Sequence, residues 1–242
     1  MKTAVVKVSK TLRAPISLED RAARLNAETQ SMTAGETIAA MAVEFRGRIA
    51  LVSSFGSESA ALLHLVAEVE PSTPVLFIET EKHFVQTNAY REELTDRLGL
   101  TDVRIIHPDI DETARIDPKG DLWKRDNDAC CALRKVRPLS RALEGFDAWF
   151  TGRKRMHGNL RSFLPIVEAA PPHIKINPLA RWSAQELADY MSVHDLPPHP
   201  LVETGFSSIG CWPCTAPTAP GDDARAGRWR GLGKTECGIH RI

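Results

Sequence analysis

Four of the five cysteines in the chain fall into two close pairs. One pair is Cys130-Cys131, and the other is Cys211-x-x-Cys214. Four thiolates suit a tetrahedral zinc ion or a cubane iron–sulfur cluster. Because adjacent side chains diverge on a helix or a strand, Cys130 and Cys131 reach one compact ion only with strain, whereas a cluster of several irons accepts both more easily. The pattern therefore favours an iron–sulfur cluster, with zinc or buried structural thiols as the alternatives.

The fifth cysteine, Cys237, stands alone near the end of the chain and has cations as neighbours. Lys234 precedes it, and His240 and Arg241 follow it. Nearby positive charge favours the thiolate, which is the nucleophilic form of cysteine. The segment is rich in glycine, which predicts a tail able to carry the thiol to a substrate and then to a second protein. The alternative is an incidental cysteine in a disordered chain end.

Two groups of cations are suited to bind a phosphate or a sulfate. The first is the loop Arg153-Lys154-Arg155, followed by Arg161, and the second is the pair Arg225 and Arg228. Arginine matches the oxygens of these anions with two parallel donors. The basic loop begins at Gly152, directly after a predicted strand, and this position favours an anion site over a solvated run of charge.

Short apolar runs alternate with helical patterns along most of the chain. We predict strands over 49–53, 74–78, 103–107 and 147–151, and one or two short edge strands within 164–176. We predict helices that begin after Ser17, Thr33, Ser59 and Ser183, a helix over 84–98, and one from Cys130 to Leu143 that is interrupted at Pro138. Residues 110–128 are polar and are expected to be irregular.

This alternation predicts a doubly wound, mostly parallel α/β sheet of Rossmann-like type, with a Gly/Pro-rich C-terminal tail. We divide the chain into an N-terminal arm and first helix (1–30), a nucleotide-binding α/β domain (31–205) and a C-terminal segment (206–242). The last segment carries Cys211, Cys214 and Cys237.

The loop between the first predicted strand and the following helix has the composition of an anion site. In open α/β sheets, ligands bind beyond the carboxyl ends of the strands. The hydroxyls and backbone N–H groups there are expected to bind an anion together with the helix N-terminus; the residues are Ser53, Ser54, Gly56, Ser57 and Ser59. An ordinary serine-capped turn is the alternative. The loop matches neither a Walker A sequence nor Gly-x-Gly-x-x-Gly.

Composition excludes several classes of protein. Lys plus Arg and Asp plus Glu both number 31 in the 242 residues, so the zero net charge argues against nucleic-acid binding driven by bulk charge. The N-terminus lacks the apolar region of a signal peptide, and no apolar run approaches the roughly 20 residues of a membrane span. We expect a cytoplasmic protein without membrane contact, in which clustered cysteines indicate metal or redox chemistry rather than disulfides.

The loop 53–59 resembles the phosphate-binding loop of the PP-loop, or adenine nucleotide alpha-hydrolase-like, superfamily. The usual form of that loop is Ser-Gly-Gly-x-Asp-Ser, and here Phe55 replaces the first glycine and Glu58 replaces the aspartate. This variant is similar to the loop of the reductase branch of the superfamily. Residues 77–87 resemble the second-strand motif of the same branch, with Glu79 and Glu81 as departures. The basic loop Thr151-Gly152-Arg153-Lys154-Arg155 resembles its Thr-Gly-x-Arg element.

Taken together, the chain from about Ile49 onward closely resembles the thioredoxin-dependent assimilatory adenylyl-sulfate (APS) reductases of the PAPS/APS reductase family. The motifs that carry the resemblance are Cys130-Cys131-x-x-Arg134-Lys135, Cys211-x-x-Cys214 and Glu236-Cys237-Gly238-Ile239-His240. The resemblance implies a [4Fe–4S] cluster on the four paired cysteines, with Lys135 coupling the cluster to the substrate and Cys237 as the nucleophile. It implies a substrate site that includes Arg225, Arg228 and His240.

The activity implied by the resemblance is reduction of adenosine 5′-phosphosulfate to sulfite and AMP, in sulfate assimilation and cysteine biosynthesis. Cys237 would attack the sulfur to form an S-sulfocysteine, and a thiolate of thioredoxin would then release sulfite. Cations at positions 135, 153, 155, 225 and 228 would neutralise the oxygens of the substrate. The cluster would be the cofactor, without flavin or NAD, and the family suggests a homo-oligomer.

Three other functions remain open on the sequence. The nearest is a 3′-phosphoadenylyl-sulfate (PAPS) reductase or an enzyme that uses both substrates, although family members that use PAPS usually lack the four cluster cysteines. A second is a PP-loop ATP-using ligase with a metal-bound cysteine cluster. A third is a non-enzymatic nucleotide-binding or redox-sensing protein stabilised by a metal.

Overall fold

The computed structural model describes residues 16–158, 161–219, 221–231, 234 and 238–241. Its core is a six-stranded sheet in the order β3-β2-β1-β4-β6-β5. The strands are β1 (Ile49–Val52), β2 (Val75–Ile78), β3 (Val103–Ile106), β4 (Ala148–Phe150), β5 (Val167–Ala170) and β6 (His173–Ile176). Neighbouring strands run parallel except β5, which pairs antiparallel with β6. The predicted mostly parallel α/β sheet is therefore confirmed.

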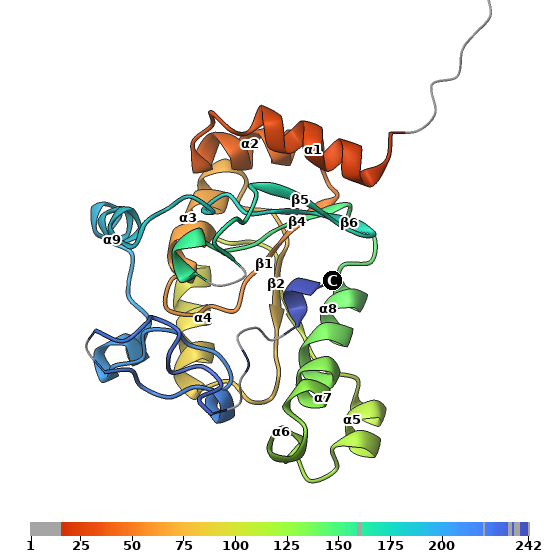
Figure 1. Cartoon of the computed structure of the whole chain (residues 1–242), viewed down its shortest axis with the longest axis vertical. Helices are drawn as coiled ribbons and strands as arrows, with labels where there is room; N and C mark the ends of the chain where they lie inside the picture. Colours follow the sequence, from red (N-terminus) through yellow and green to blue (C-terminus); the bar gives the residue numbers. More distant parts are fainter. Residues whose placement is uncertain (1–15, 159–160, 220, 232–233, 235–237, 242) are drawn as a thin grey trace, which may run out of the picture.

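Helices cover both faces of the sheet (Figure 1). They are α1 (Leu18–Glu28), α2 (Ala34–Glu44), α3 (Ser59–Val69), α4 (Val85–Arg97), α5 (Ile110–Ile116), α6 (Leu122–Arg125), α7 (Asn127–Cys131), α8 (Arg137–Ala142) and α9 (Ala184–Val193). Apolar residues of α1 to α4 share one core with Leu51, Phe77 and Phe150 of the strands. On the opposite face, α8 packs on the alternate strand residues Ala50, Leu76 and Trp149.

Capping residues define the starts of three helices as the sequence predicts. Ser17 accepts a hydrogen bond from the backbone N–H of Asp20, and Thr33 and Ser183 form complete capping boxes, each with a glutamate three residues later. Each box satisfies backbone donors that the first turn of a helix leaves without partners. Strands β1 to β4 and helix α4 also lie within two residues of their predicted bounds.

The segment 110–143 differs from the prediction. Residues 110–128 contain α5 and α6 and the start of α7, so the expectation of an irregular segment was wrong. No residue of α5 is buried, and a helix without an apolar face leaves no periodic pattern in the sequence. The next helix is interrupted by a π-helix, η1 (Ala132–Val136), which ends before Pro138 rather than at it. Pro138 instead occupies the first turn of α8, where its missing N–H costs little.

The edge-strand prediction for 164–176 is half right. The two strands there form a hairpin, but only β5 lies at the edge, because β6 pairs with β4. The C-terminal segment adds the short 3-10 helices η5 (Trp212–Cys214) and η6 (Ile239–Arg241), and it buries Ile209, Cys211 and Trp229. Figure 1 shows η6 beside α8. Within the described residues, no helix combines the length and the apolar character that a bilayer crossing requires.

Candidate functional site

A pocket lies at the carboxyl ends of β1, β2 and β4 and encloses about 200 Å³. It gathers most of the side chains for which the sequence predicts binding roles. Those that line it are Ser53, Ser54, Gly56, Ser57, Ser59, Lys135, Arg153, Lys154, Arg161, Arg225, Arg228 and His240. Arg155 is not among the lining residues; its Nε donates to the main-chain oxygen of Leu164 at 2.8 Å, within the basic loop.

The loop after β1 is held in one conformation by its own hydroxyls. Ser53 Oγ accepts from the Phe55 N–H at 3.2 Å, and Ser59 Oγ accepts from the Gly56 N–H at 2.8 Å. Phe55 has a φ of 47° and is fully buried, with its ring packed edge-on against Phe77 at 5.6 Å. The phenylalanine that departs from the usual loop pattern is therefore a core residue that anchors the loop.

Glu58, the other departure in this loop, joins it to the basic loop. Its carboxylate pairs with Lys154 Nζ at 2.7 Å and with His157 Nε2 at 3.1 Å. Burial alone would raise the pKa of Glu58, but the hydrogen bond from His157 and the charge of Lys154 lower this pKa to about 2. Lys154 is 1% exposed, so the carboxylate stabilises a buried ammonium that a hydrophobic neighbour would leave uncompensated.

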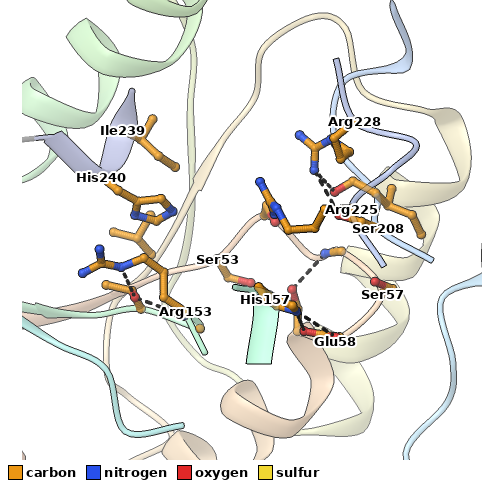
Figure 2. Close-up of a pocket in the computed structure, with 18 of the residues that line it drawn as sticks. Ser53, Ser57, Glu58, Arg153, His157, Ser208, Arg225, Arg228, Ile239 and His240 are labelled. Atoms are coloured by element: carbon orange, nitrogen blue, oxygen red, sulfur yellow. Dashed lines mark hydrogen bonds and ion pairs between the residues drawn. The ribbon is translucent and has the colours of Figure 1, made fainter. Parts of the chain in front are cut away.

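Cations reach the pocket from two directions. Figure 2 shows Arg153 and His240 on one side and Arg225, Arg228 and Ser208 on the other. Arg153 is fixed by Glu168, with which it forms an ion pair, and by Asn177 Oδ1 at 3.2 Å.

On the opposite side, Arg228 Nη1 donates to the main-chain oxygen of Ile209 at 3.3 Å, and its guanidinium lies 4.5 Å from the Trp229 ring centroid. A Cβ at Gly210 would collide with this guanidinium. A side chain at position 210 would therefore displace the Arg228 guanidinium from the position described here.

The two cysteine pairs lie directly behind one wall of the pocket. Burial, followed by the charges of Cys131, Cys211 and Cys214, raises the pKa of Cys130 to about 11, so the other three thiols lie within electrostatic reach of Cys130. None of these four cysteines forms a disulfide, and all but Cys214 are buried. Among the described residues, no set of three or more His, Cys, Asp or Glu side chains is arranged to share a metal ion.

Polar groups approach the sulfurs from several elements. Asn127 Nδ2 donates to Cys214 Sγ at 3.1 Å, and the Thr80 hydroxyl lies 3.2 Å from Cys211 Sγ. Lys234 Nζ lies 3.6 Å from Cys131 Sγ. Thr80 also lines the pocket, so the cysteine group and the pocket share a wall.

The motif residues Arg134 and Lys135 have different surroundings. Arg134 is buried, and its guanidinium pairs with Asp117 Oδ2 at 2.9 Å and with Glu81. Lys135 lines the pocket. Both lie in the π-helix that follows Cys131, and π-turns in proteins often mark functional sites. Cys237, the predicted nucleophile, lies outside the described residues, and so do residues 235 and 236.

Several residues of the site were not singled out by the sequence analysis. His157 and the buried Asp117 and Lys175 are examples. His83 lines the pocket, and its Nε2 lies 3.0 Å from the Ile78 main-chain oxygen. His83 lies within residues 77–87, which resemble a second-strand motif, but the resemblance assigned no role to this histidine. Asp117 and Lys175 belong to no motif, and the only signal for Lys175 was its position between the apolar residues Ile174 and Ile176.

A pocket lined by cations at the carboxyl ends of parallel strands, with a serine-rich loop leading into a helix, is typical of nucleotide-binding α/β proteins. Residues 48–217 match the model of the phosphoadenosine phosphosulfate reductase domain. The chain belongs to this family.

Relatives support the same assignment. The chain is 50% identical over 229 residues to an adenosine 5′-phosphosulfate reductase of Chelativorans sp. (strain BNC1), covering 93% of each protein. It is 53% identical over 196 residues to the enzyme of that name from Mesorhizobium japonicum, covering 81% of this chain and 77% of the relative. The crystal structure of a phosphoadenylyl-sulfate reductase from Candida auris, solved as a phosphate complex, matches with a TM-score of 0.69 at 24% identity. That match covers 88% of this chain and all of the other, and it confirms the fold.

Proposed function

We propose that the protein reduces adenosine 5′-phosphosulfate to sulfite and AMP, with thioredoxin as the electron donor. The observation that carries the proposal is the convergence of three cationic groups on one pocket beside a serine-rich loop. These groups are the basic loop after β4, Lys135 of the π-helix, and the C-terminal pair Arg225 and Arg228. The 50% identity to a protein of this name supports the substrate.

The donor set beside the pocket fits a [4Fe–4S] cluster. Such a cluster requires four cysteine ligands outside disulfides, and we assign these roles to Cys130, Cys131, Cys211 and Cys214. Hydrogen-bond donors near the sulfurs, including Asn127, suit thiolates that carry negative charge. When bound, the cluster would contribute an electrostatic centre next to the substrate, whether or not it changes its redox state.

The first chemical step belongs to Cys237. Its thiolate attacks the sulfur of the phosphosulfate, a new S–S bond forms, and the bond from sulfur to the bridging oxygen breaks with AMP as the leaving group. The substrate oxygens gain charge as AMP departs. Lys135, Arg153, Arg225 and Arg228 are suited to stabilise that charge, because all four are cations that line the pocket.

The second step uses an external dithiol. A thiolate of thioredoxin attacks the Cys237 sulfur, the S–S bond to the sulfonate breaks, and sulfite leaves with the electron pair. The second thiol of thioredoxin then resolves the mixed disulfide, which regenerates Cys237 and leaves thioredoxin oxidised. The two electrons that reduce the sulfonate to sulfite therefore come from the dithiol. Such a donor implies the reducing cytoplasm, and we propose a homo-oligomer on the strength of the family alone.

The substrate choice has one close competitor, which is PAPS. The family description and the Candida auris relative both name the 3′-phosphorylated nucleotide. Two features favour APS: the relatives with the higher identity carry that name, and the four cysteines fit a cluster. Glu58, an ionised carboxylate in the pocket wall, would repel the additional 3′-phosphate of PAPS rather than attract it.

The experiment that tests the proposal is sulfite release by protein purified without oxygen, supplied with reduced thioredoxin and either APS or PAPS. Iron and acid-labile sulfide are measured on the same sample. We expect sulfite mainly from APS, with about four irons per chain. Sulfite mainly from PAPS would keep the mechanism and overturn the substrate. No sulfite from either, with zinc in place of iron, would sink the reductase assignment.

Cys237→Ser separates the two cysteine roles. We expect this variant to form no sulfite, because the nucleophile is gone, while it retains the iron content of the wild type, because Cys237 is not a proposed ligand. Cys131→Ser is the matched variant and is expected to lose iron. A Cys237→Ser protein that still forms sulfite at the wild-type rate would rule out the S-sulfocysteine intermediate.

A further inference from the structure

Lys175 is a buried lysine to which the reaction proposed above assigns no role. It lies on β6 and is 2% exposed. Its register partners are Trp149 on β4 and Glu168 on β5, so these side chains project from the same face of the sheet. Burial, followed by the positive charge of Arg153, lowers the pKa of Lys175 to about 7. An ammonium at such a position is costly unless a polar partner compensates it.

The partner of Lys175 belongs to the end of the chain. Its Nζ donates to the main-chain oxygen of His240 at 3.0 Å and lies 5.0 Å from the Trp149 ring centroid. The His240 imidazole stacks on the same Trp149 ring, with centroids 6.4 Å apart and an interplanar angle of 9°. Ile239 packs against the apolar residues around Trp149. Lys175 and Trp149 together therefore seat η6 on the sheet.

Within the described part of the chain, the charged side chains around Lys175 do not pair with it, and its ammonium donates to the main-chain oxygen of His240. Arg153, from the loop after β4, is a cation that disfavours a second one nearby. Glu168, which lies opposite Lys175 on β5, directs its carboxylate to Arg153 and to the Asn177 side chain. The side chain of His240 is held neutral, because burial and the surrounding cations lower its pKa well below the usual value.

The turn that Lys175 holds is close in sequence to the proposed nucleophile. Ile239 follows Cys237 by two residues, and His240 itself lines the pocket. Gly238, which directly precedes Ile239, has a φ of 85°, and a Cβ added there would lie 3.5 Å from Val136 Cγ2. The residue that leads into η6 therefore lies beside the π-helix that carries Lys135.

We propose that Lys175 is a positioning residue for the C-terminal thiol: by binding the His240 carbonyl, it fixes the turn from which Cys237 reaches the substrate. The inference rests on the proposed role of Cys237 as nucleophile. Lys175 is not among the residues that line the pocket, so its effect on catalysis is transmitted through η6. Displacement of a reacting group by about 1 Å can cost about 100-fold in rate, so a loosened turn is expected to slow the first step.

The test compares full-length wild type with Lys175→Met, which removes the ammonium and keeps the aliphatic stem, and with Lys175→Arg, which keeps a cationic donor. Lys119→Met, a change at an exposed lysine, is the matched control. Hydrogen exchange of the peptide that contains Ile239–Arg241 measures how firmly η6 is held. Steady-state sulfite formation from APS gives kcat and KM, and the rate of Cys237 alkylation is followed by mass spectrometry.

We expect Lys175→Met to speed amide exchange in this peptide and alkylation of Cys237, and to lower kcat by about 10- to 100-fold. Its KM for APS should change by less than about threefold, since the phosphate-binding cations remain. Lys175→Arg should recover most of the exchange protection and part of kcat, and Lys119→Met should match the wild type. If Lys175→Met does not fold, Lys175→Gln replaces it, with the same directions expected.

Two results would overturn the proposal: exchange in η6 that is the same in Lys175→Met and wild type, or faster exchange with an unchanged kcat. Failure of the proposed function is a separate result. If the wild type forms no sulfite from either nucleotide, the reductase assignment fails, while exchange and alkylation in the same proteins still measure whether Lys175 holds the turn.

Discussion

Glu58 shows how one residue can depart from a family pattern and still have a clear physical role. Its carboxylate compensates Lys154, which is buried, and holds His157 beside the pocket. The sequence marks Glu58 only as a departure from aspartate, because the partners of a loop residue 96 positions away from Lys154 depend on the tertiary fold.

The Glu58 ion pairs predict a pH-dependent stability. The folded-state pKa of about 2 lies below the ordinary value of 4.5, so the stabilisation is complete above pH 4.5 and is lost as the pH falls through about 2. We expect Glu58→Gln to lower the free energy of unfolding at pH 7 by about 3 kcal/mol. The deficit should shrink at pH 3, as measured by urea denaturation.

The exposed Glu68 provides the control for this measurement. Glu68→Gln should change the free energy of unfolding by less than about 0.5 kcal/mol at either pH. A Glu58→Gln deficit of equal size at pH 7 and pH 3 would show that the charge of the carboxylate is not what stabilises the fold.

Trp229 is the residue on which the C-terminal cations depend. Its ring lies under Arg228 at 4.5 Å and Arg225 at 5.6 Å, and it packs against Cys131. We expect Trp229→Leu to weaken AMP binding about tenfold, because cation–π contacts of about 0.5–2 kcal/mol that orient the guanidinium groups are lost. Trp229→Phe, which keeps an aromatic face, should stay within about threefold. Calorimetric titration with AMP measures both, and equal losses in the two variants would refute the cation–π explanation.

At the scale of elements, the sequence is most informative where a helix or strand has a buried face and a capping residue. Helix α2 combines the Thr33 capping box with Ile38 and Met41 on its buried face, and β1 is a short apolar run. The start of α2 and both ends of β1 were predicted within one residue. Helix α5 has a capping residue, Asp109, but no buried face, and the π-helix has no sequence signature. The segment 110–136 was therefore the one most poorly predicted.

The same contrast holds for the site. The cationic loop and the serine-rich loop could be placed at the pocket from the sequence, because each is a compact motif next to a strand end, and the tail arginines could be placed there through the family resemblance. The distinct surroundings of Arg134 and Lys135 were not, since adjacent residues on a surface helix are equally compatible with solvent. Arg134 differs from Lys135 because it pairs with Asp117 and Glu81, which come from two other segments of the chain.

The buried pair of Arg134 and Asp117 predicts how the cysteine-bearing helix is held. The side chain of Asp117 is fully buried, and Arg134 is its closest cation. We expect Arg134→Leu to destabilise the protein by about 3 kcal/mol, because the carboxylate keeps its burial and loses that partner. Thermal unfolding measures the effect, and iron content shows whether Cys130 and Cys131 remain in place.

A second substitution serves as the control for this pair. Adding Asp117→Asn to Arg134→Leu removes the stranded charge, so the double variant should be more stable than Arg134→Leu alone. If the two losses simply add, the interaction between the side chains is not what the single variant measures.

At the scale of the whole molecule, charge is balanced overall but unevenly distributed. The net charge is zero, yet the pocket is lined by five lysines and arginines from the strand loops and the tail, together with Lys135 of the π-helix. We therefore expect AMP binding to weaken about tenfold between 0.05 and 0.5 M salt, as screening shortens the range of these charges. Adenosine, which lacks the phosphate, is the matched ligand, and calorimetry should find its affinity nearly constant. If salt weakened the binding of both ligands equally, the cations of the pocket would not contribute to the binding of the AMP phosphate.

The order in which the chain is made bears on when the site can exist. Cys131 and Cys211 are 80 residues apart (211 − 131 = 80), so at about 5–20 residues per second a ribosome needs about 4–16 s to travel from one to the other. The thiols of Cys130 and Cys131 are thus synthesised well before their companions, and the arginines at 225 and 228 come later still. The central sheet is therefore synthesised before the candidate site is complete, and synthesis of residues 211–228, rather than folding of the strands, sets the moment at which the two cysteine pairs and the arginines at 225 and 228 first meet.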